Sequence, residues 1–236
     1  MMKQTATWLK TADSVVVLTG AGMSTESNIP DFRSRSGWWQ QVDPMTIATP
    51  EALEGNPEQF KAFYKARLEA LEEAEPNRGH QIIARWEERG LVDRVATQNV
   101  DGLHQRAGSR NVDALHGTIH AIRCHRCDRP HELDAFLRDE ACVSCGGVLR
   151  PGVVLFGEML PQDAWQRALK AIEKADVVLV IGTSLDVYPV NQLPSVTGGK
   201  TVYINRDIDQ SIHAFDAVHQ GSAGEILEEL DRLMEA

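Results

Sequence analysis

The sequence lacks any apolar run approaching the roughly 20 residues that a membrane-spanning helix needs, so we expect no association with a membrane. Its first residues, MMKQTATWLKTADSVVV, contain no separate hydrophobic region followed by a cleavage site, which argues against a secretory signal. We therefore expect a cytoplasmic protein.

Positive charge is also scarce. The chain has 24 Lys and Arg against 34 Asp and Glu, which gives a formal net charge of −10. This balance disfavours general binding to a phosphate backbone, so we expect no specific nucleic-acid partner, and cationic protein substrates fit better. The 236 residues suffice for one substantial core, or for a core with a small satellite.

Cysteine is rare and confined to one segment. The four cysteines form two pairs, Cys124-x-x-Cys127 and Cys142-x-x-Cys145. Two such hooks can close a tetrahedral site around one structural Zn²⁺, and four thiolates leave no open position for catalysis. His120, His125 and His131 lie nearby and offer alternative ligands, and two disulfides or free thiols are the alternative interpretation.

Four β-branched runs predict buried strands: 13–20, 93–102, 176–185 and 200–205. Helices are predicted between and after them, at 57–74, 79–89, 161–174 and 223–235. This alternation predicts an α/β fold, a Rossmann-like and mostly parallel sheet with helices on both faces. Polar clusters follow each predicted strand, namely GAG, TQNVD, GTS and YINRD. Because ligands of such sheets bind beyond the carboxyl ends of the strands, these clusters predict a nucleotide site.

A third glycine is missing from the loop after the first strand. Gly20 and Gly22 suit a G-x-G-x-x-G fingerprint, but Thr25 stands at the last position. The two glycines allow backbone N–H groups to approach a pyrophosphate, although a structural turn explains them equally well. The missing glycine argues against a hydride-transferring dehydrogenase.

Two segments interrupt the alternating pattern, and we interpret both as parts of a smaller lobe. Residues 34–75 carry a loop and a helix, and residues 119–149 carry the cysteines. The larger, nucleotide-binding domain is then expected to comprise 1–33, 76–118 and 150–236. His116 lies at this seam, where a cleft is expected, and an imidazole suits proton abstraction at neutral pH. A satisfied structural histidine is the alternative.

Seven ordered motifs resemble those of the sirtuins, which are NAD-dependent protein-lysine deacylases. They are GAGMSTESNIPDFR, TQNVDGLH, LHG, the paired CxxC hooks, RPGVVLFGEMLP, GTSLDVYP and YIN. The resemblance runs from about Val15 to the terminal helix. It implies acylated-lysine protein substrates and a loop that binds NAD so that nicotinamide is cleaved off.

The resemblance also implies roles for individual residues. His116 matches the general base, and Asn99, with Asp101, is placed to hold the nicotinamide carboxamide. Further positions implied to bind NAD are Gly20, Ala21, Gly22, Thr25, Phe32, Arg33, Gln98, Val100, Gly182, Thr183, Ser184, Asn205 and Arg206.

The implied reaction begins with attack of the acyl-lysine carbonyl oxygen on C1′ of the nicotinamide ribose. His116 then takes a proton from the ribose hydroxyls, and water releases free lysine and O-acyl-ADP-ribose. The substrate peptide is expected to add as a strand between 152–158 and 184–189. Val153, Phe156, Gly157 and Val187 are expected to contact it, whereas Val154 is expected in the core.

Three further features of the sequence concern how it compares with the sirtuins. Asn28 stands where the family usually has glycine, and we expect it to keep a left-handed backbone. Tyr64 and Arg67 share one helix face, and Tyr-x-x-Arg pairs in some sirtuins hold the carboxylate of succinyl- or malonyl-lysine; a solvated helix face is the alternative. Trp38 and Trp39 match the family's mobile cofactor loop, or else serve as packing anchors.

Two other functions remain compatible with the sequence. One is a mono-ADP-ribosyltransferase that uses the same nicotinamide cleavage. The other is a zinc-ribbon binding protein with a vestigial nucleotide pocket, although no basic stripe accompanies the ribbon.

Overall fold

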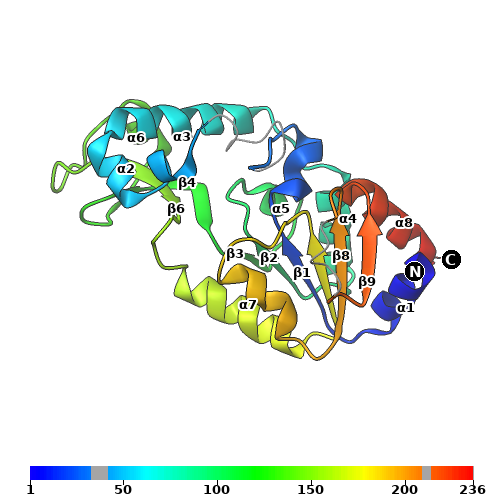
Figure 1. The fold of residues 1–236 in the computed structure, drawn as a ribbon. Helices are drawn as coiled ribbons and strands as arrows, with labels where there is room; N and C mark the ends of the chain where they lie inside the picture. Colours follow the sequence, from blue (N-terminus) through cyan, green and yellow to red (C-terminus); the bar gives the residue numbers. More distant parts are fainter. Residues whose placement is uncertain (33–41, 209–213, 236) are drawn as a thin grey trace.

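The computed structural model describes residues 1–32, 42–208 and 214–235 (Figure 1). Its larger sheet has six strands, and every neighbouring pair is parallel. In spatial order the strands are β3 (Val112–Ala114), β2 (Arg94–Thr97), β1 (Val15–Thr19), β7 (Val177–Ile181), β8 (Lys200–Asn205) and β9 (Ala217–Gln220). The predicted α/β fold is confirmed.

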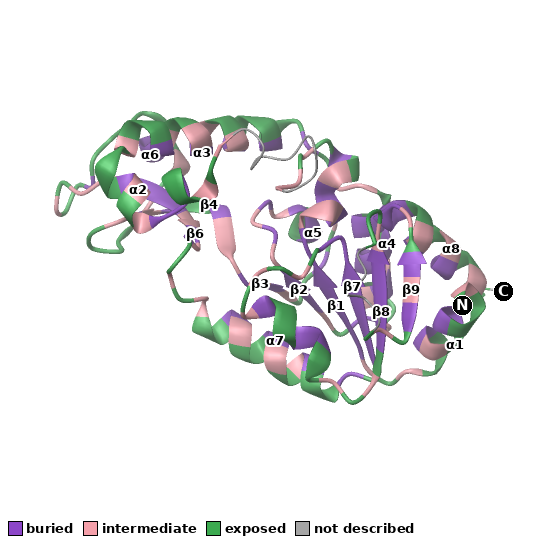
Figure 2. Ribbon diagram, viewed as in Figure 1, coloured by how far each residue is buried: buried purple, intermediate pink, exposed green. Residues whose placement is uncertain are grey.

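Helices cover both faces of this sheet because its central strands are apolar on both sides. Val15 and Val17 of β1 face one hydrophobic cluster, and Val16 and Leu18 face another. The first cluster is covered by α1 (Met2–Thr11), α4 (Arg78–Glu88) and α8 (Ala223–Glu235). The second is covered by α7 (Gln162–Lys174) and the short 3₁₀ helix η4 (Val190–Ser195). Figure 2 shows the strands of the sheet as the most deeply buried part of the molecule.

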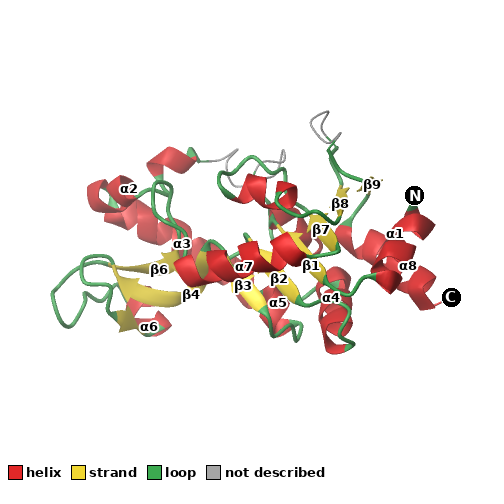
Figure 3. Ribbon diagram, turned by 90° about the horizontal axis from the view of Figure 1, so that it is seen from below, coloured by secondary structure: helices red, strands yellow, loops and turns green. Residues whose placement is uncertain are grey.

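A smaller lobe lies at the end of the molecule away from α1 and α8 (Figure 3). Its elements are α2 (Pro50–Gly55), α3 (Pro57–Glu72), α6 (Leu133–Leu137) and an antiparallel sheet of β5 (Pro130–His131), β4 (Gly117–Cys124) and β6 (Leu149–Val153). A third hydrophobic cluster, with Phe60 and Phe136 among its fully buried members, joins these helices to the sheet. The lobe therefore has a core of its own.

The four predicted helices correspond to α3, α4, α7 and α8, with ends shifted by one or two residues at most. The four predicted strands correspond to β1, β2, β7 and β8, although β2 stops at Thr97 and its polar tail continues into the short helix α5 (Leu103–Arg106). Helix α1, the edge strands β3 and β9, and the antiparallel sheet were not predicted. No helix in the described ranges is both long and apolar enough to span a membrane.

Candidate active site and metal centre

A cavity of about 1170 Å³ lies at the carboxyl edge of the parallel sheet, and both this edge and the smaller lobe contribute residues to its lining. Residues at the carboxyl ends of β1, β2, β7 and β8 all contribute to its wall, namely Gly20, Gln98, Gly182 and Asn205. The expectation that the four polar clusters meet at one edge is thus confirmed. Tyr64 and Arg67 of α3 line it from the smaller lobe.

The glycine loop packs tightly against the loop that follows β7. The Gly22 N–H donates to the Gly182 carbonyl over 2.8 Å. A Cβ atom at Gly20 would lie 2.6 Å from the Thr183 Cβ, and one at Gly22 would lie 2.8 Å from the Gly182 Cα. These two glycines therefore allow two loop backbones to touch, and both loops line the cavity.

The rest of the loop takes a course that needs no third glycine. Residues Ala21–Ser27 form a 3₁₀ segment (η1), and the Thr25 hydroxyl donates to the Gly22 carbonyl over 2.9 Å. The segment ends at Asn28, whose φ of 61° is left-handed. The prediction for Asn28 is confirmed.

A buried polar network lies beneath this loop. The Asn99 side-chain amide donates to the Gly20 carbonyl over 3.0 Å and to the Ser24 hydroxyl over 3.1 Å. Ser24 in turn donates to the Asp101 carboxylate over 2.7 Å, and the other carboxylate oxygen accepts from the Leu103 N–H. The network uses both N–H groups of the Asn99 side-chain amide. In the described part of the chain, no donor forms a hydrogen bond with the amide oxygen. It is available to a ligand.

A second network fixes the ends of β2, β7 and β8. Gln98 donates to the Thr183 hydroxyl over 2.9 Å, and the Tyr203 hydroxyl donates to the Thr183 carbonyl over 2.7 Å. Asn205 donates to the Tyr203 oxygen over 2.8 Å. Tyr203 was not singled out from the sequence. Its place within YIN at a strand end was the only signal that pointed to it.

His116 has a defined tautomer. Its Nδ1 lies 3.1 Å from the carbonyl oxygen of Gln98, and because a carbonyl only accepts, Nδ1 carries the proton. Nε2 is then the basic nitrogen, and it has no hydrogen-bond partner among the described residues. Burial lowers the pKa of His116, although the hydrogen bond to Gln98 acts in the opposite direction. The ring, which lines the cavity, is therefore a neutral base at pH 7.

Tyr64 and Arg67 do not lie on a solvated helix face. Tyr64 is 2% exposed, and the Arg67 guanidinium lies 5.2, 5.7 and 5.6 Å from the ring centres of Phe32, Phe63 and Tyr64. Burial lowers the pKa of Arg67, while the negative charge of Asp101 opposes the shift. No carboxylate within the described ranges forms an ion pair with Arg67. Its positive charge is thus presented to the cavity without a side-chain counter-ion.

Most of the other predicted site residues also line this cavity: Ala21, Val100, Ser184, Val153, Phe156 and Val187. Thr25 and Arg206 instead line an adjoining cavity of about 900 Å³ that shares Gly22, Gly182 and Asn205 with the first. Gly157 lines neither cavity. Arg33, Trp38 and Trp39 lie outside the described residues. Val154 lines the main cavity, so its assignment to the core was wrong.

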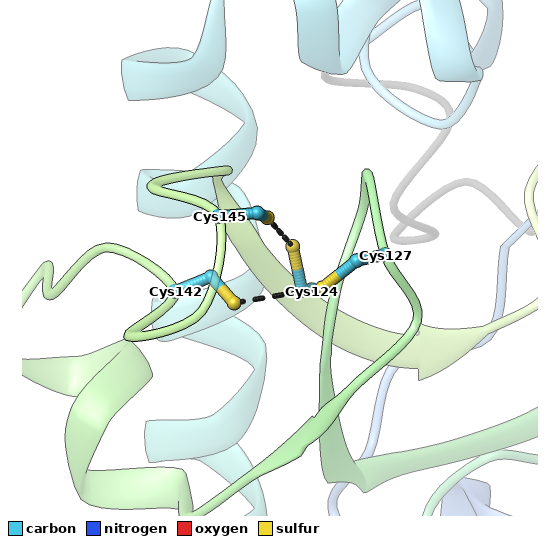
Figure 4. A group of neighbouring side chains, drawn as sticks. All are labelled: Cys124, Cys127, Cys142 and Cys145. Carbon is cyan, nitrogen blue, oxygen red and sulfur yellow. Dashed lines mark hydrogen bonds between the residues drawn. The ribbon is translucent and has the colours of Figure 1, made fainter.

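The four cysteines converge in the smaller lobe (Figure 4). The sulfurs of Cys124 and Cys145 lie 3.5 Å apart, those of Cys127 and Cys142 lie 3.6 Å apart, and all four are within 4.8 Å of one another. Disulfide sulfurs lie about 2.0 Å apart, whereas a tetrahedron with Zn–S bonds of about 2.3 Å separates them by about 3.8 Å. The cluster fits Zn²⁺, and Cys124, Cys127, Cys142 and Cys145 would hold it.

The surroundings of the cysteines support the same conclusion. A Cβ at Gly147 would lie 2.9 Å from the Cys124 sulfur, so the loop leaves room for sulfur and little else. His131 Nε2 lies 3.3 Å from the Cys142 sulfur, while His125 contacts Glu54 and His120 is exposed on β4. None of these histidines replaces a cysteine in the cluster.

Comparison with known proteins agrees with this geometry. The family model described as "Sir2 family" matches residues 20–189. NAD-dependent protein deacetylase 1 of Geobacillus kaustophilus is 47% identical over 229 residues, which cover 95% of each chain. NAD-dependent protein deacylase 1 of Archaeoglobus fulgidus is 43% identical over 224 residues, covering 92% of this chain and 91% of that protein.

A solved structure of a Sir2 protein with a deacetylated p53 peptide and 3′-O-acetyl ADP-ribose gives a TM-score of 0.92 at 34% identity. The match covers 98% of this chain and 97% of the other. The chain belongs to the Sir2 family.

Proposed function

We propose that this protein is an NAD-dependent protein-lysine deacylase that releases nicotinamide, O-acyl-ADP-ribose and free lysine. The observation that carries the proposal is His116, a neutral imidazole whose free Nε2 shares one cavity with the glycine loop and Asn99. The NAD-dependent deacetylase and deacylase relatives support the same reaction.

In this proposal NAD supplies the glycosidic bond whose cleavage drives the reaction. The backbone of the glycine loop is proposed to approach the phosphates, and Phe32 and Arg33 are proposed to contact the reacting ribose. Asn99 and Asp101 orient the nicotinamide carboxamide in a pocket that Ser24 preorganises, and His116 Nε2 accepts a proton from a ribose hydroxyl. The other NAD-binding assignments made from the sequence are part of the same proposal.

The peptide is proposed to bind as an added strand between 152–158 and 184–189. The backbone N–H groups of Gly157 and Val187 have no acceptor in the described part of the chain, so each can donate to an incoming strand. Phe156 is 39% exposed at the mouth of the cavity, and Val153 is buried deeper. A p53 peptide in the solved Sir2 structure is consistent with acylated proteins as partners.

The two lobes divide this work. We propose that residues 1–33, 76–118 and 150–236 bind NAD, while 34–75 and 119–149 supply the acyl-side wall and the zinc-binding part. The division of the hydrophobic core into two clusters on the large sheet and one in the smaller lobe supports it. The cysteine cluster requires reduced thiols, which favours a cytoplasmic location.

The proposed function is tested by mass spectrometry of the protein mixed with NAD and an acetylated peptide. We expect deacylated peptide, nicotinamide and O-acyl-ADP-ribose in equal amounts. The His116→Ala variant should lose this activity, and the matched control His120→Ala, altered on the exposed face of β4, should keep it. ADP-ribosylated protein instead of deacylated peptide would identify an ADP-ribosyltransferase, and intact NAD would favour a binding protein.

We further propose that Tyr64 and Arg67 accept acyl groups that end in a carboxylate. Arg67 has no acidic partner in the described part of the chain, and its guanidinium is held among three aromatic rings at the cavity wall. A succinyl or malonyl carboxylate would complete this arrangement through paired hydrogen bonds.

The acyl preference is tested by the ratio of succinyl- to acetyl-peptide turnover. Arg67→Met should lower this ratio by about tenfold or more, since a charge-assisted hydrogen bond contributes about 1.5–3 kcal/mol. Lys65→Met, which removes a cation from the same helix outside the cavity, is the matched control. An unchanged ratio in Arg67→Met would refute the acyl assignment without affecting the proposed deacylation.

A further inference from the structure

Arg150 is the most deeply buried cation described in the molecule. It lies in β6 with 0% exposure, beside the segment that follows this strand. Its Nη2 donates to the Glu158 carboxylate over 2.8 Å and approaches the Val153 carbonyl at 3.4 Å. Nε and Nη1 have no partner among the described residues. A buried guanidinium with two unused donors is costly, and an apolar side chain would fill the same space more favourably.

Glu158 forms hydrogen bonds with Leu155 through both its backbone and its side chain, and these bonds close a turn. The carboxylate oxygen that accepts from Arg150 also accepts from the Leu155 N–H over 2.9 Å, and the Glu158 N–H donates to the Leu155 carbonyl over 3.0 Å. Gly157, inside the turn, has a φ of +89°, which glycine adopts at low cost. Burial disfavours the ionised form, but the hydrogen bonds from Arg150 and Leu155 outweigh it and lower the pKa of Glu158. The Glu158 carboxyl is therefore ionised at neutral pH.

The same segment is attached at two further points to the cavity wall. The Val154 N–H donates to the His116 carbonyl over 2.9 Å, and the Phe156 N–H donates to the Ala48 carbonyl over 2.8 Å. Residues 153–156 line the cavity. The ion pair thus holds one end of a segment whose other contacts lead to the catalytic imidazole and to the smaller lobe.

We propose that Arg150 and Glu158 are positioning residues that hold segment 154–158 in the shape on which the acyl-lysine peptide docks. This inference rests on the proposed function and adds the residues that preorganise its peptide site. Neither side chain needs to touch the substrate. Arg150 acts through Glu158, and Glu158 acts through the Leu155 N–H. The Gly157 N–H takes no part in the hydrogen bonds of this turn among the described residues.

The proposal separates the two substrates kinetically. NAD is proposed to bind at the ends of β1, β2, β7 and β8, whereas the ion pair makes its backbone hydrogen bonds with Val153 and Leu155 of the peptide segment. Glu158→Gln should therefore raise KM for the acyl-lysine peptide by about tenfold, the size expected for the loss of one charge-assisted hydrogen bond. KM for NAD should stay within about twofold of the original value. Glu140→Gln, which removes a carboxylate from an exposed ion pair with Arg138, is the matched control and should change neither.

A second variant separates positioning from stability. The double variant Arg150→Met with Glu158→Met replaces the pair by apolar side chains, which often preserves stability. It should unfold cooperatively and retain zinc, yet show the same increase in peptide KM, because the Leu155 N–H has lost its acceptor.

Two results would overturn the proposal. One is a peptide KM within twofold of the original in both variants, or a rise matched by an equal rise in KM for NAD. The other is loss of cooperative unfolding and of bound zinc in both Glu158→Gln and the double variant, which would show that the ion pair is needed for folding. If the unaltered protein fails to consume NAD with acyl-peptide, it is the proposed function that is refuted.

Discussion

Acidification should destabilise this protein through His80, a histidine that the proposed reaction does not use. His80 lies in the first turn of α4 and is 0% exposed, and neither ring nitrogen has a partner among the described residues. Its ring packs against that of His104, with ring centres 4.8 Å apart. Burial lowers the pKa of His80 to about 4, although the carboxylates of Asp101 and Glu26 oppose the shift.

The sign and size of the effect follow from linkage. A histidine in the unfolded chain titrates near 6.5, so the unfolded state gains a proton before the folded state does, and stability is lost as the pH falls from about 6.5 towards about 4. Between pH 7.5 and pH 5.0, this one group should lower the free energy of unfolding by about 2 kcal/mol. Burial also lowers the pKa of His104, of His116 and of His219, which adds to the loss in the same direction.

Urea unfolding at the two pH values tests this reasoning. His80→Phe keeps an aromatic ring against His104 but cannot bind a proton, so its stability should fall by about 2 kcal/mol less than that of the unaltered protein. Protonation of the cysteine thiolates affects both proteins alike. His125→Gln, altered at a partly exposed histidine beside Glu54, should behave like the unaltered protein. Equal losses in His80→Phe and the unaltered protein would refute the assigned pKa.

Three further outcomes are expected. In Gly182→Ala the new Cβ would lie 2.3 Å from the Met23 nitrogen, at a φ of +62°. Urea unfolding should therefore show a loss of about 2 kcal/mol or more in the free energy of unfolding, and titration with NAD should show weaker binding. Gly198→Ala, where a Cβ would meet open space, is the control and should change neither quantity. Chelation of zinc, or Cys127→Ser, should abolish activity together with cooperative unfolding of the smaller lobe, because a closed four-thiolate site supplies folding energy and no chemistry; metal-free protein with full activity would contradict this. Because burial lowers the pKa of His116, the acid limb of kcat/KM should lie below about 6.5, and a limb above pH 7 would contradict the assignment of His116 as the base.

The large sheet could be predicted because its central strands are unambiguous. Val15 to Leu18 and Val177 to Ile181 are continuous apolar runs followed by a glycine within two residues, and their short length and β-branched residues favour a strand buried on both faces. The antiparallel sheet gave no such signal. Strand β4 alternates exposed and buried residues irregularly, and its register with β6 shifts between Thr118 and Ile122, so periodicity is lost there.

Within the site, the sequence predicted a residue's location correctly where its type and position allow few structural roles. Four clustered cysteines, and polar residues at strand ends, constrain their neighbours strongly. Nothing in the sequence marks the contacts of Arg150, Glu158 and Tyr203, because they depend on the turn between Leu155 and Glu158 and on the pairing of β7 with β8. Val154 was misassigned for the same reason, since an apolar residue in an apolar run carries no mark of which side faces a cavity.

The glycine loop joins these arguments. In a dehydrogenase fingerprint the third glycine lets a helix pack closely on its strand, but here the chain after Gly22 forms a 3₁₀ segment that is held by the Thr25 hydroxyl and ends at Asn28. The first two glycines are needed for the contact with Gly182. Because the segment then passes over Asn99 and Asp101, its Ser24 hydroxyl completes the buried network beneath the cavity. The missing glycine therefore reflects a change in the direction of the chain, and that direction places a buried polar network at the position where the proposed reaction would release nicotinamide.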